Sequence, residues 1–144
     1  MSNLNIMKVK KLSKTAVIPY KAHKDDAGFD VFASKSVMAK PFSTVKVPLG
    51  IAIQLPKDYY ADLRPRSGMT FSTPLKGHLG TIDNGYRGEI QVMFTNVSDG
   101  NYWISVGEKI GQLVIHRLPE FKAVEVDELS ETDRGENGFG STGK

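Results

Sequence analysis

The stretch STVKVPLGIAIQLP, residues 43–56, alternates apolar and polar side chains around a glycine and two prolines. Val45 and Val47 are two residues apart, and the same spacing recurs from Ile51 to Leu55. A period of two places successive apolar side chains on one face of a β-strand. The stretch therefore predicts two short strands, each with one buried face.

Other short runs along the chain share this character. They are rich in Val, Ile, Phe and Tyr, and Gly, Pro, Asn and Asp separate them. Such runs predict an all-β sandwich or barrel, and no stretch shows a long helical period. The runs are IMKVKKL (6–12), FDVFA (29–33), EIQVMFTNV (89–97), NYWISV (101–106), KIGQLVIHRL (109–118) and FKAVEV (121–126).

One segment, SGMTFSTPL at residues 67–75, interrupts the β pattern. Ser67 is a residue type that begins helices, and Pro74 would end one. We expect one short helix here, with its first amides directed toward whatever Arg66 and Ser67 bind.

The composition suits a single globular domain. The chain has 144 residues, of which 40% are hydrophobic and 24% charged. It has no cysteine, which agrees with a reducing compartment, and it contains no apolar run of about 18 residues that would predict a membrane span. The start also lacks an apolar core of signal-peptide length, so we expect a cytoplasmic protein with no membrane partner.

The net charge of +3 is mild, and the placement of arginine is more informative. Four of the five arginines lie inside glycine-containing blocks. A planar guanidinium suits bidentate contacts with phosphate or carboxylate, which favours binding of a small oxyanion over chance or structural ion pairing. Aromatic residues make up only 9%, which argues against nucleic acid as a partner.

The end of the chain differs from the rest. The run DELSETDRGENGFGSTGK, residues 127–144, has too few apolar side chains to pack as a further layer. We therefore expect a β-barrel domain over residues 1–126 and a flexible C-terminal arm over 127–144. There is no internal repeat and no interdomain linker.

Two blocks in the first half of the chain carry groups suited to phosphate chemistry. In DAGFDVFA (26–33), Asp26 and Asp30 could order water around a magnesium ion, although carboxylates beside a glycine more often cap turns. In PRSGM (65–69), a guanidinium, a hydroxyl and exposed amides fall within three residues. A nucleophilic Ser67 is not favoured, because the G-x-S-x-G pattern is absent.

The block GTIDNGYRGEIQV, residues 80–92, combines an acid with an aromatic ring on a tight turn. Asn84-Gly85 is a strong hairpin signal, and EIQV would continue as the second strand. Asp83 could simply form the turn, or it could orient an attacking water while Tyr86 offers a flat face to a ring.

Two later blocks give weaker evidence of function when each is taken alone. GEKIGQLVI (107–115) is a glycine turn that leads into a strand carrying Gln112. RGENGFGSTGK (134–144) could wrap phosphate oxygens with its amides while Arg134 neutralises charge. It is not a P-loop, because GxxxxGK[ST] is absent.

Together and in this order, the five blocks resemble the five motifs of the trimeric dUTPase family, and the match spans Ala27 to Gly143. The resemblance implies a distorted jelly-roll β-barrel, a homotrimer, and hydrolysis of dUTP to dUMP and pyrophosphate. Such an enzyme limits uracil incorporation into DNA and supplies dUMP for dTMP synthesis. Each active site would take motifs 1, 2 and 4 from one subunit, motif 3 from a second, and the arm from a third.

The resemblance also implies roles for individual residues. Asp83 would position the attacking water, and Arg66 would be its catalytic partner at the phosphates. Tyr86 would stack beneath the deoxyribose, Asp30 would act on Mg²⁺ through bound water, and Phe139 would cover the uracil. The implied substrate-binding residues are Ser67, Gly68, Gly80, Ile82, Tyr86, Gln112, Arg134, Phe139, Gly140, Ser141 and Thr142.

Departures from the motifs are small, and two other functions stay open. Lys109 and Gly111 stand where the family often has arginine and alanine, and we assign Lys109 no phosphate contact. A dCTP deaminase shares the fold, but its catalytic acid is a glutamate and the acid here is Asp83. A dUTPase-like trimer that mainly binds a regulatory protein is the other alternative, although no feature identifies such a partner.

Overall fold

The alternating stretch at residues 43–56 forms two strands, β4 (Thr44–Pro48) and β5 (Ile51–Gln54), as predicted. The structure is a computed structural model that describes residues 4–140. Within this range the remaining strands are β1 (Lys8–Lys11), β2 (Gly28–Phe32), β3 (Val37–Ala39), β6 (Tyr59–Arg64), β7 (Leu75–Gly77), β8 (Gly80–Ile82), β9 (Gln91–Asn96), β10 (Tyr102–Ile104) and β11 (Lys109–Arg117). The all-β prediction is confirmed.

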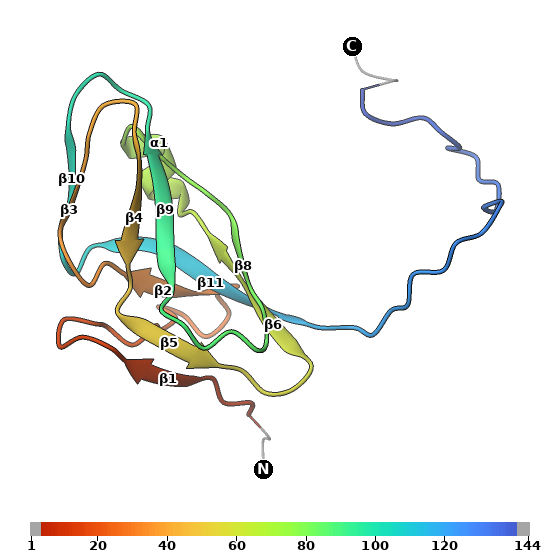
Figure 1. The fold of residues 1–144 in the computed structure, drawn as a ribbon, viewed down its shortest axis with the longest axis horizontal. Coiled ribbons are helices and arrows are strands. Elements are labelled where there is room, and N and C mark those ends of the chain that lie inside the picture. The colour runs from red at the N-terminus through yellow and green to blue at the C-terminus, as the bar shows by residue number, and fades with distance from the viewer. Residues whose placement is uncertain (1–3, 141–144) are drawn as a thin grey trace.

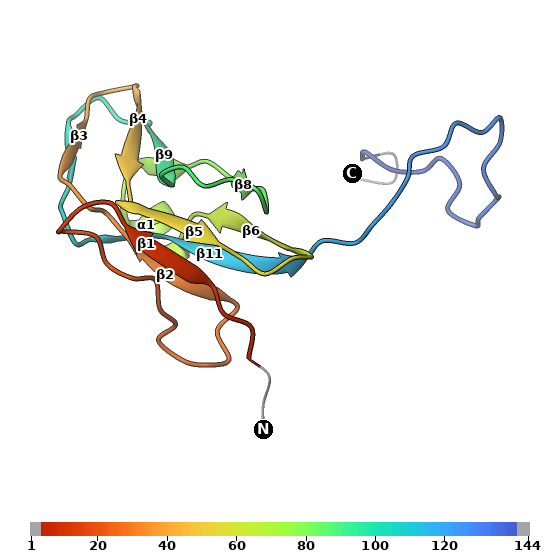
Figure 2. The same cartoon turned by 60° about the horizontal axis from the view of Figure 1, so that its bottom comes forward.

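The strands form four small antiparallel sheets that enclose one core (Figure 1). The largest sheet has the order β2-β11-β6-β8, and a second sheet has the order β4-β9-β7. The pairs β1-β5 and β10-β3 complete the body. Figure 2 shows β4 and β9 on one side of the body, with β5, β11 and β2 on the other.

The core consists of the inward side chains of these alternating strands. In β9, Val92, Phe94 and Asn96 are buried, whereas Gln91 and Met93 face outward. Asn96 is fully buried, and its amide donates to the carbonyl oxygens of Ala39 and Gly100 at 2.9 and 2.8 Å, so burial leaves it satisfied. The other large side chains that are fully buried include Leu49, Ile51, Leu75, Ile90, Ile104, Ile110 and Leu113.

The short helix α1 (Ser67–Ser72) lies where the sequence predicted it. Met69 is its buried residue, and the hydroxyl of Thr73, just beyond the last turn, donates to the Met69 carbonyl oxygen at 2.7 Å. No helix within residues 4–140 has both the length and the apolar character needed to cross a membrane.

The predicted hairpin at Asn84-Gly85 is wrong, although the turn itself forms. The Tyr86 N–H donates to the Asp83 carbonyl oxygen at 3.0 Å. However, β8 pairs with β6, and β9 pairs with β4 and β7, so the flanking strands lie in different sheets. The Ile90 N–H donates to the carbonyl oxygen of Ile51, the first residue of β5, at 3.0 Å, so the chain leaves the β6-β8 ladder before β9 begins.

The predicted strand FKAVEV, residues 121–126, is also wrong for a single chain. Strand β11 ends at Arg117, and residues 118–140 contain no strand or helix. Figures 1 and 2 both show this segment running away from the body. Its apolar side chains therefore find no sheet to pack on: Phe121 is 89% exposed and Leu129 is 86% exposed.

Candidate active site

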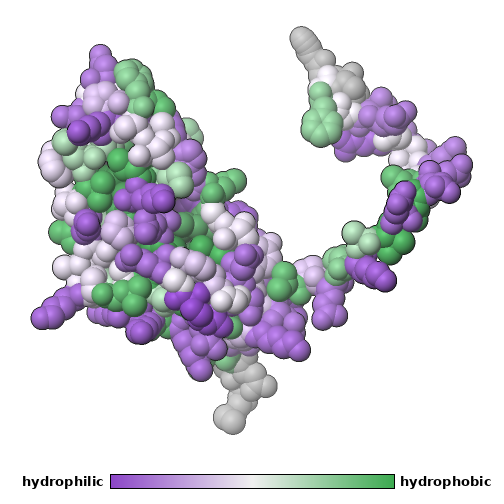
Figure 3. All heavy atoms as spheres, viewed as in Figure 1, coloured by the Kyte–Doolittle hydropathy of each residue, from purple (hydrophilic) through white to green (hydrophobic). Residues whose placement is uncertain are grey.

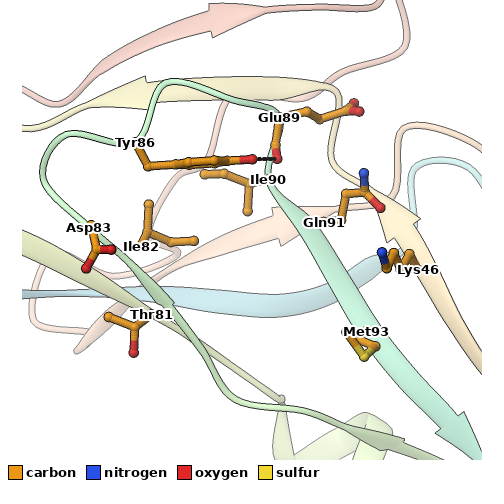
Figure 4. Close-up of a pocket in the computed structure, with 9 residues that line it drawn as sticks. All are labelled: Lys46, Thr81, Ile82, Asp83, Tyr86, Glu89, Ile90, Gln91 and Met93. Carbon is orange, nitrogen blue, oxygen red and sulfur yellow. Dashed lines mark hydrogen bonds between the residues drawn. The ribbon is translucent and has the colours of Figure 1, made fainter.

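The turn that follows β8 places Asp83 and Tyr86 at the edge of a cavity of about 340 Å³. The cavity lies between the 80–90 segment and strands β4 and β9 (Figure 4). Both side chains are exposed, so a ligand can reach them directly. The other lining residues are Lys46, Thr81, Ile82, Glu89, Ile90, Gln91 and Met93.

The Tyr86 ring is fixed at its far end. Its hydroxyl donates to the Glu89 carbonyl oxygen at 2.8 Å, as Figure 4 shows. Gly88 lies directly against the ring, because a Cβ at that position would be 2.4 Å from the Tyr86 hydroxyl oxygen. The sequence places Gly88 in a motif, but only the structure shows that the missing side chain makes room for Tyr86.

Main-chain groups are also available beside Asp83. Strand β8 is the edge of its sheet, since β6 is its only neighbour there. An edge strand directs half of its N–H and C=O groups away from the ladder. Gly80 and Ile82, which the sequence analysis assigned to substrate binding, lie on this strand.

A second group of predicted residues lies around the start of α1. Arg66 precedes the helix, and its Nη1 donates to the Lys109 carbonyl oxygen at 3.4 Å. Ser67 and Gly68 are exposed in the first turn of α1. A cavity of about 280 Å³ at this place is lined by Arg66, Gly68, Met69, Thr73, Glu108 and Lys109. It joins the PRSGM block to the beginning of the GEKIGQLVI block.

Asp30 and Gln112 belong to this second group. Gln112 pairs with Asp30 across β11 and β2, and its Nε2 donates to the Pro65 carbonyl oxygen at 3.4 Å. A Cβ at Gly28 would be 2.7 Å from the Gln112 Oε1, so the glycine makes room for this side chain. Three separate blocks of the sequence therefore meet at one end of the largest sheet.

Lys109 is a site residue that the sequence analysis left without a role. Its Nζ lies 3.2 Å from Asp30 Oδ2, and both side chains are largely covered. The signal in the sequence was a lysine in place of the usual arginine, but its partner became visible only when β2 and β11 were paired. The Lys109 ammonium neutralises the charge of the Asp30 carboxylate, which the resemblance assigns to the magnesium ion.

No group of three or more His, Cys, Asp or Glu side chains that could enclose a metal ion occurs among residues 4–140. Mg²⁺ in nucleotide enzymes is typically held by one or two carboxylates, waters and the substrate phosphates. The single carboxylate of Asp30 fits this kind of site, with the remaining ligands supplied by water and the phosphates.

One chain does not bring the two groups together. Gln112 pairs with Arg64 on β6, whereas Ile82 pairs with Ala61, so Asp83 lies beyond the Ala61 end. With a rise of about 3.3 Å per residue and a strand spacing of about 4.8 Å, the Cα atoms of Asp83 and Gln112 are roughly 16 Å apart. This separation exceeds the combined length of the two side chains.

An ionic cluster occupies the sheet between the two groups. Asp62 Oδ2 lies 3.0 Å from His116 Nε2 and 3.2 Å from Arg64 Nη2, and the His116 ring stacks on Tyr60 at 5.2 Å. His116 belongs to the β6-β11 surface, where its partners are Asp62, Arg64 and Tyr60.

The predicted arm residues lie far from both groups. Arg134 donates from Nε to the Asn137 carbonyl oxygen at 2.8 Å, a contact within the arm itself. Phe139 is fully exposed, and both Phe139 and Gly140 have left-handed backbone angles of 48° and 83°. Ser141 and Thr142 lie outside the described residues.

Comparison with known proteins gives consistent results. A family model described as dUTPase matches residues 14–143. A deoxyuridine 5'-triphosphate nucleotidohydrolase of Clostridium novyi (strain NT) is 45% identical over 142 residues, which cover 94% of this chain and 96% of that protein.

Solved structures of dUTPases are also similar to this chain. The Staphylococcus bacteriophage 80alpha dUTPase with dUPNHPP has a TM-score of 0.92 and 32% identity, and covers 98% of this chain and 100% of its own. A mutant dUTPase from phage phi11 of S. aureus, described as coordinating a structural Mg(II) ion, has a TM-score of 0.82 and 27% identity. That match covers 88% of this chain and 100% of the phage chain.

Proposed function

The chain belongs to the dUTPase family, and from this membership and the site we propose how it hydrolyses dUTP to dUMP and pyrophosphate. The turn that presents Asp83 and Tyr86 at one cavity is the observation that carries the residue assignments. The activity itself follows from the family, whose relatives cover nearly the whole chain.

We propose that three copies of the chain build each active site. Asp83 and Gln112 are too far apart within one chain to act on one phosphate, so a second copy has to supply one of them. The apolar side chains of the segment after β11 point to the same conclusion, since Phe121, Val124 and Leu129 are exposed in the single chain. Figure 3 shows hydrophobic atoms, separated by hydrophilic ones, along the segment that runs away from the body. Packing on neighbouring subunits would remove this surface from water.

Asp83 is proposed to position the water that attacks the α-phosphorus. The water oxygen forms the new P–O bond, the bond to the oxygen bridging the α- and β-phosphorus breaks, and pyrophosphate leaves. The proton of the water passes toward the Asp83 carboxylate and then to solvent. Orientation supplies much of the rate gain in such a reaction, because a water held in line replaces random collisions.

Recognition of deoxyuridine is proposed to use β8 and Tyr86. The outward main-chain groups of the edge strand, including those of Gly80 and Ile82, can pair with the polar edge of uracil. The Tyr86 ring would lie beneath the deoxyribose and leave no space for a 2′-hydroxyl. The space that holds the uracil beside β8 would be too narrow for the methyl group of thymine.

The triphosphate is proposed to bind the group around α1 and then the arm. Arg66, Ser67 and Gly68 would contact the α- and β-phosphates, and Gln112 would add a polar contact. The arm would close over the γ-phosphate and the base, with Phe139 on the uracil. The arm residues proposed to contact the phosphates are Arg134, Gly140, Ser141 and Thr142.

Magnesium is proposed as the cofactor, held by Asp30 through water. When bound, the ion neutralises phosphate charge and sets the geometry of the triphosphate. Lys109 Nζ, 3.2 Å from Asp30 Oδ2, pairs with this carboxylate and would compete with the ion for it. The family relatives favour neither of the other two functions considered, deamination of dCTP or a mainly regulatory role. A cytoplasmic location stays a prediction from the sequence.

The test is a substrate panel of dUTP, UTP, dTTP and dCTP with Mg²⁺. We expect equal amounts of dUMP and pyrophosphate from dUTP and little product from the others. Release of ammonia from dCTP would overturn the assignment. Equal turnover of dUTP and UTP would exclude the proposed role of Tyr86.

A further inference from the structure

The side chain of Asp83 has room to move on both sides. It lines the cavity of about 340 Å³ that it shares with Tyr86 and also a cavity of about 540 Å³ bordered by Tyr60, Asn84 and Leu118. Asp83 is itself exposed, so packing does not hold its carboxylate in place. The position of the carboxylate therefore depends on how firmly the turn is attached to the body.

The upstream side of the turn is attached by a β-ladder. Ile82, the residue before Asp83, pairs with Ala61 on β6. The ladder ends there, and no further strand begins until β9. The downstream side of Asp83 needs a different support.

Asn84 supplies that support. Its Nδ2 donates to the Pro56 carbonyl oxygen at 2.9 Å and to the Tyr59 carbonyl oxygen at 2.8 Å. Asn84 is half-buried, whereas Gly85 and Tyr86 beside it are exposed. Both hydrogens of the amide are used. Pro56 lies in the connection between β5 and β6, and Tyr59 is the first residue of β6.

The accepting carbonyls are brought together by an unusual backbone. Asp58 lies between Pro56 and Tyr59 and has a φ of 72°, in the left-handed region that non-glycine residues rarely adopt. The main chain of Asn84 is held as well, because Arg87 Nη1 donates to its carbonyl oxygen at 2.7 Å. The residue after Asp83 is therefore fixed through its side chain and through its backbone.

We propose that Asn84 is a positioning residue, which holds the Asp83 carboxylate at the place of water attack by tying the turn to Pro56 and to Tyr59 at the start of β6. This inference rests on the role proposed above for Asp83. A side chain that donates twice from one atom is required here. Aspartate has the same shape but would place a carboxylate against two carbonyl oxygens, and alanine would leave both oxygens unpaired.

The experiment compares Asn84→Ala and Asn84→Asp with the unchanged full-length protein. We expect kcat for dUTP to fall by roughly 10- to 100-fold, the size of effect that a small misplacement of a reacting group produces. Binding of a non-hydrolysable dUTP analogue should weaken by less than about threefold, since β8 stays paired with β6. Asn101→Ala, an exposed asparagine before β10, is the matched control and should keep normal turnover.

A double-mutant cycle separates positioning from a general structural role. Combined with Asp83→Asn, either substitution at Asn84 should lower the residual turnover by less than about twofold, because the group that Asn84 positions is already gone. Equal losses in both backgrounds, or unchanged kcat in the single variants, would overturn the inference. If Asn84→Ala does not fold, Asn84→Asp carries the same comparison.

The same variants distinguish a wrong role for Asp83 from a wrong role for Asn84. Full turnover in Asp83→Asn alone would remove the role of Asp83 and the inference with it. Loss of turnover in Asp83→Asn together with normal kcat in both Asn84 variants would overturn only the role of Asn84.

Discussion

Replacing Gly88 with alanine should damage sugar discrimination more than it damages the fold. The added Cβ would lie 2.4 Å from the Tyr86 hydroxyl oxygen and 2.6 Å from its Cζ. Non-bonded heavy atoms prefer about 3.5 Å, so the ring must retreat by about 1 Å. The hydrogen bond from Tyr86 to the Glu89 carbonyl oxygen would then break, at a net cost of about 1 kcal/mol.

The consequence for catalysis is larger than the consequence for stability. A shift of about 1 Å in a positioning group can lower turnover by roughly 100-fold, and the space vacated by the ring would admit a 2′-hydroxyl. We expect kcat/KM for dUTP to fall by roughly 10- to 100-fold, and the preference for dUTP over UTP to shrink by roughly tenfold. Steady-state assays of pyrophosphate release with both nucleotides measure these changes.

The control is Gly100→Ala, where a Cβ would meet nothing within 4 Å. This variant should match the unchanged protein in turnover and in preference. Unaltered dUTP preference in Gly88→Ala would refute the reasoning, because it would mean that the position of Tyr86 does not decide between the two sugars.

Three further predictions follow from the site. Asp83→Asn should bind a non-hydrolysable dUTP analogue normally while losing most turnover, since the water-orienting carboxylate is gone. Titration calorimetry measures the binding and pyrophosphate release measures the turnover, and undiminished turnover would exclude the water-orienting role of Asp83. Truncation after Arg134 should leave a folded trimer by analytical ultracentrifugation but lower turnover strongly, and normal turnover would show that the arm is not a lid. Lys109→Met should free the Asp30 carboxylate and tighten Mg²⁺ binding severalfold in the nucleotide complex, whereas weaker Mg²⁺ binding would show that Lys109 helps to build the metal site.

Local patterns in the sequence predicted most of the strands. The alternation in residues 43–56 became β4 and β5, and Ser67 and Pro74 bracketed α1, because both signals act over a few neighbouring residues. The strand predicted at 121–126 carries a similar alternation, yet it has no partner in one chain. A period of two shows which side chains share one face of a strand. A strand also needs a neighbouring strand to pair with.

The hairpin predicted at Asn84-Gly85 was also wrong because local sequence does not decide which strands pair. The turn formed as its residues require, but the Ile90 N–H donates to Ile51 at the start of β5, and the two flanking strands enter different sheets. Tertiary pairing therefore overrode a strong local signal. The Asn84 side chain bonds residues more than 20 positions away, so its support for the turn could not be read from the motif.

The site residues and their division among three subunits stay predictions that the resemblance implies. Arg66, Lys109 and Gln112 come together because β11 lies between β2 and β6, a long-range pairing that no motif records. Asp83 and the arm remain apart from them in the single chain. The resemblance implied a site shared between copies, and mixing different copies can test this implication.

The most direct test of that claim mixes two inactive variants of the full assembly. Asp83→Asn lacks the water-orienting acid but has the arm, and the chain truncated after Arg134 has the acid but lacks the arm. If each site takes Asp83 and the arm from different copies, an equal mixture refolded together should recover about a quarter of the unchanged turnover, since each mixed trimer regains one complete site. Activity no greater than the sum of the separate variants would contradict the account, because it would place Asp83 and its arm in the same chain.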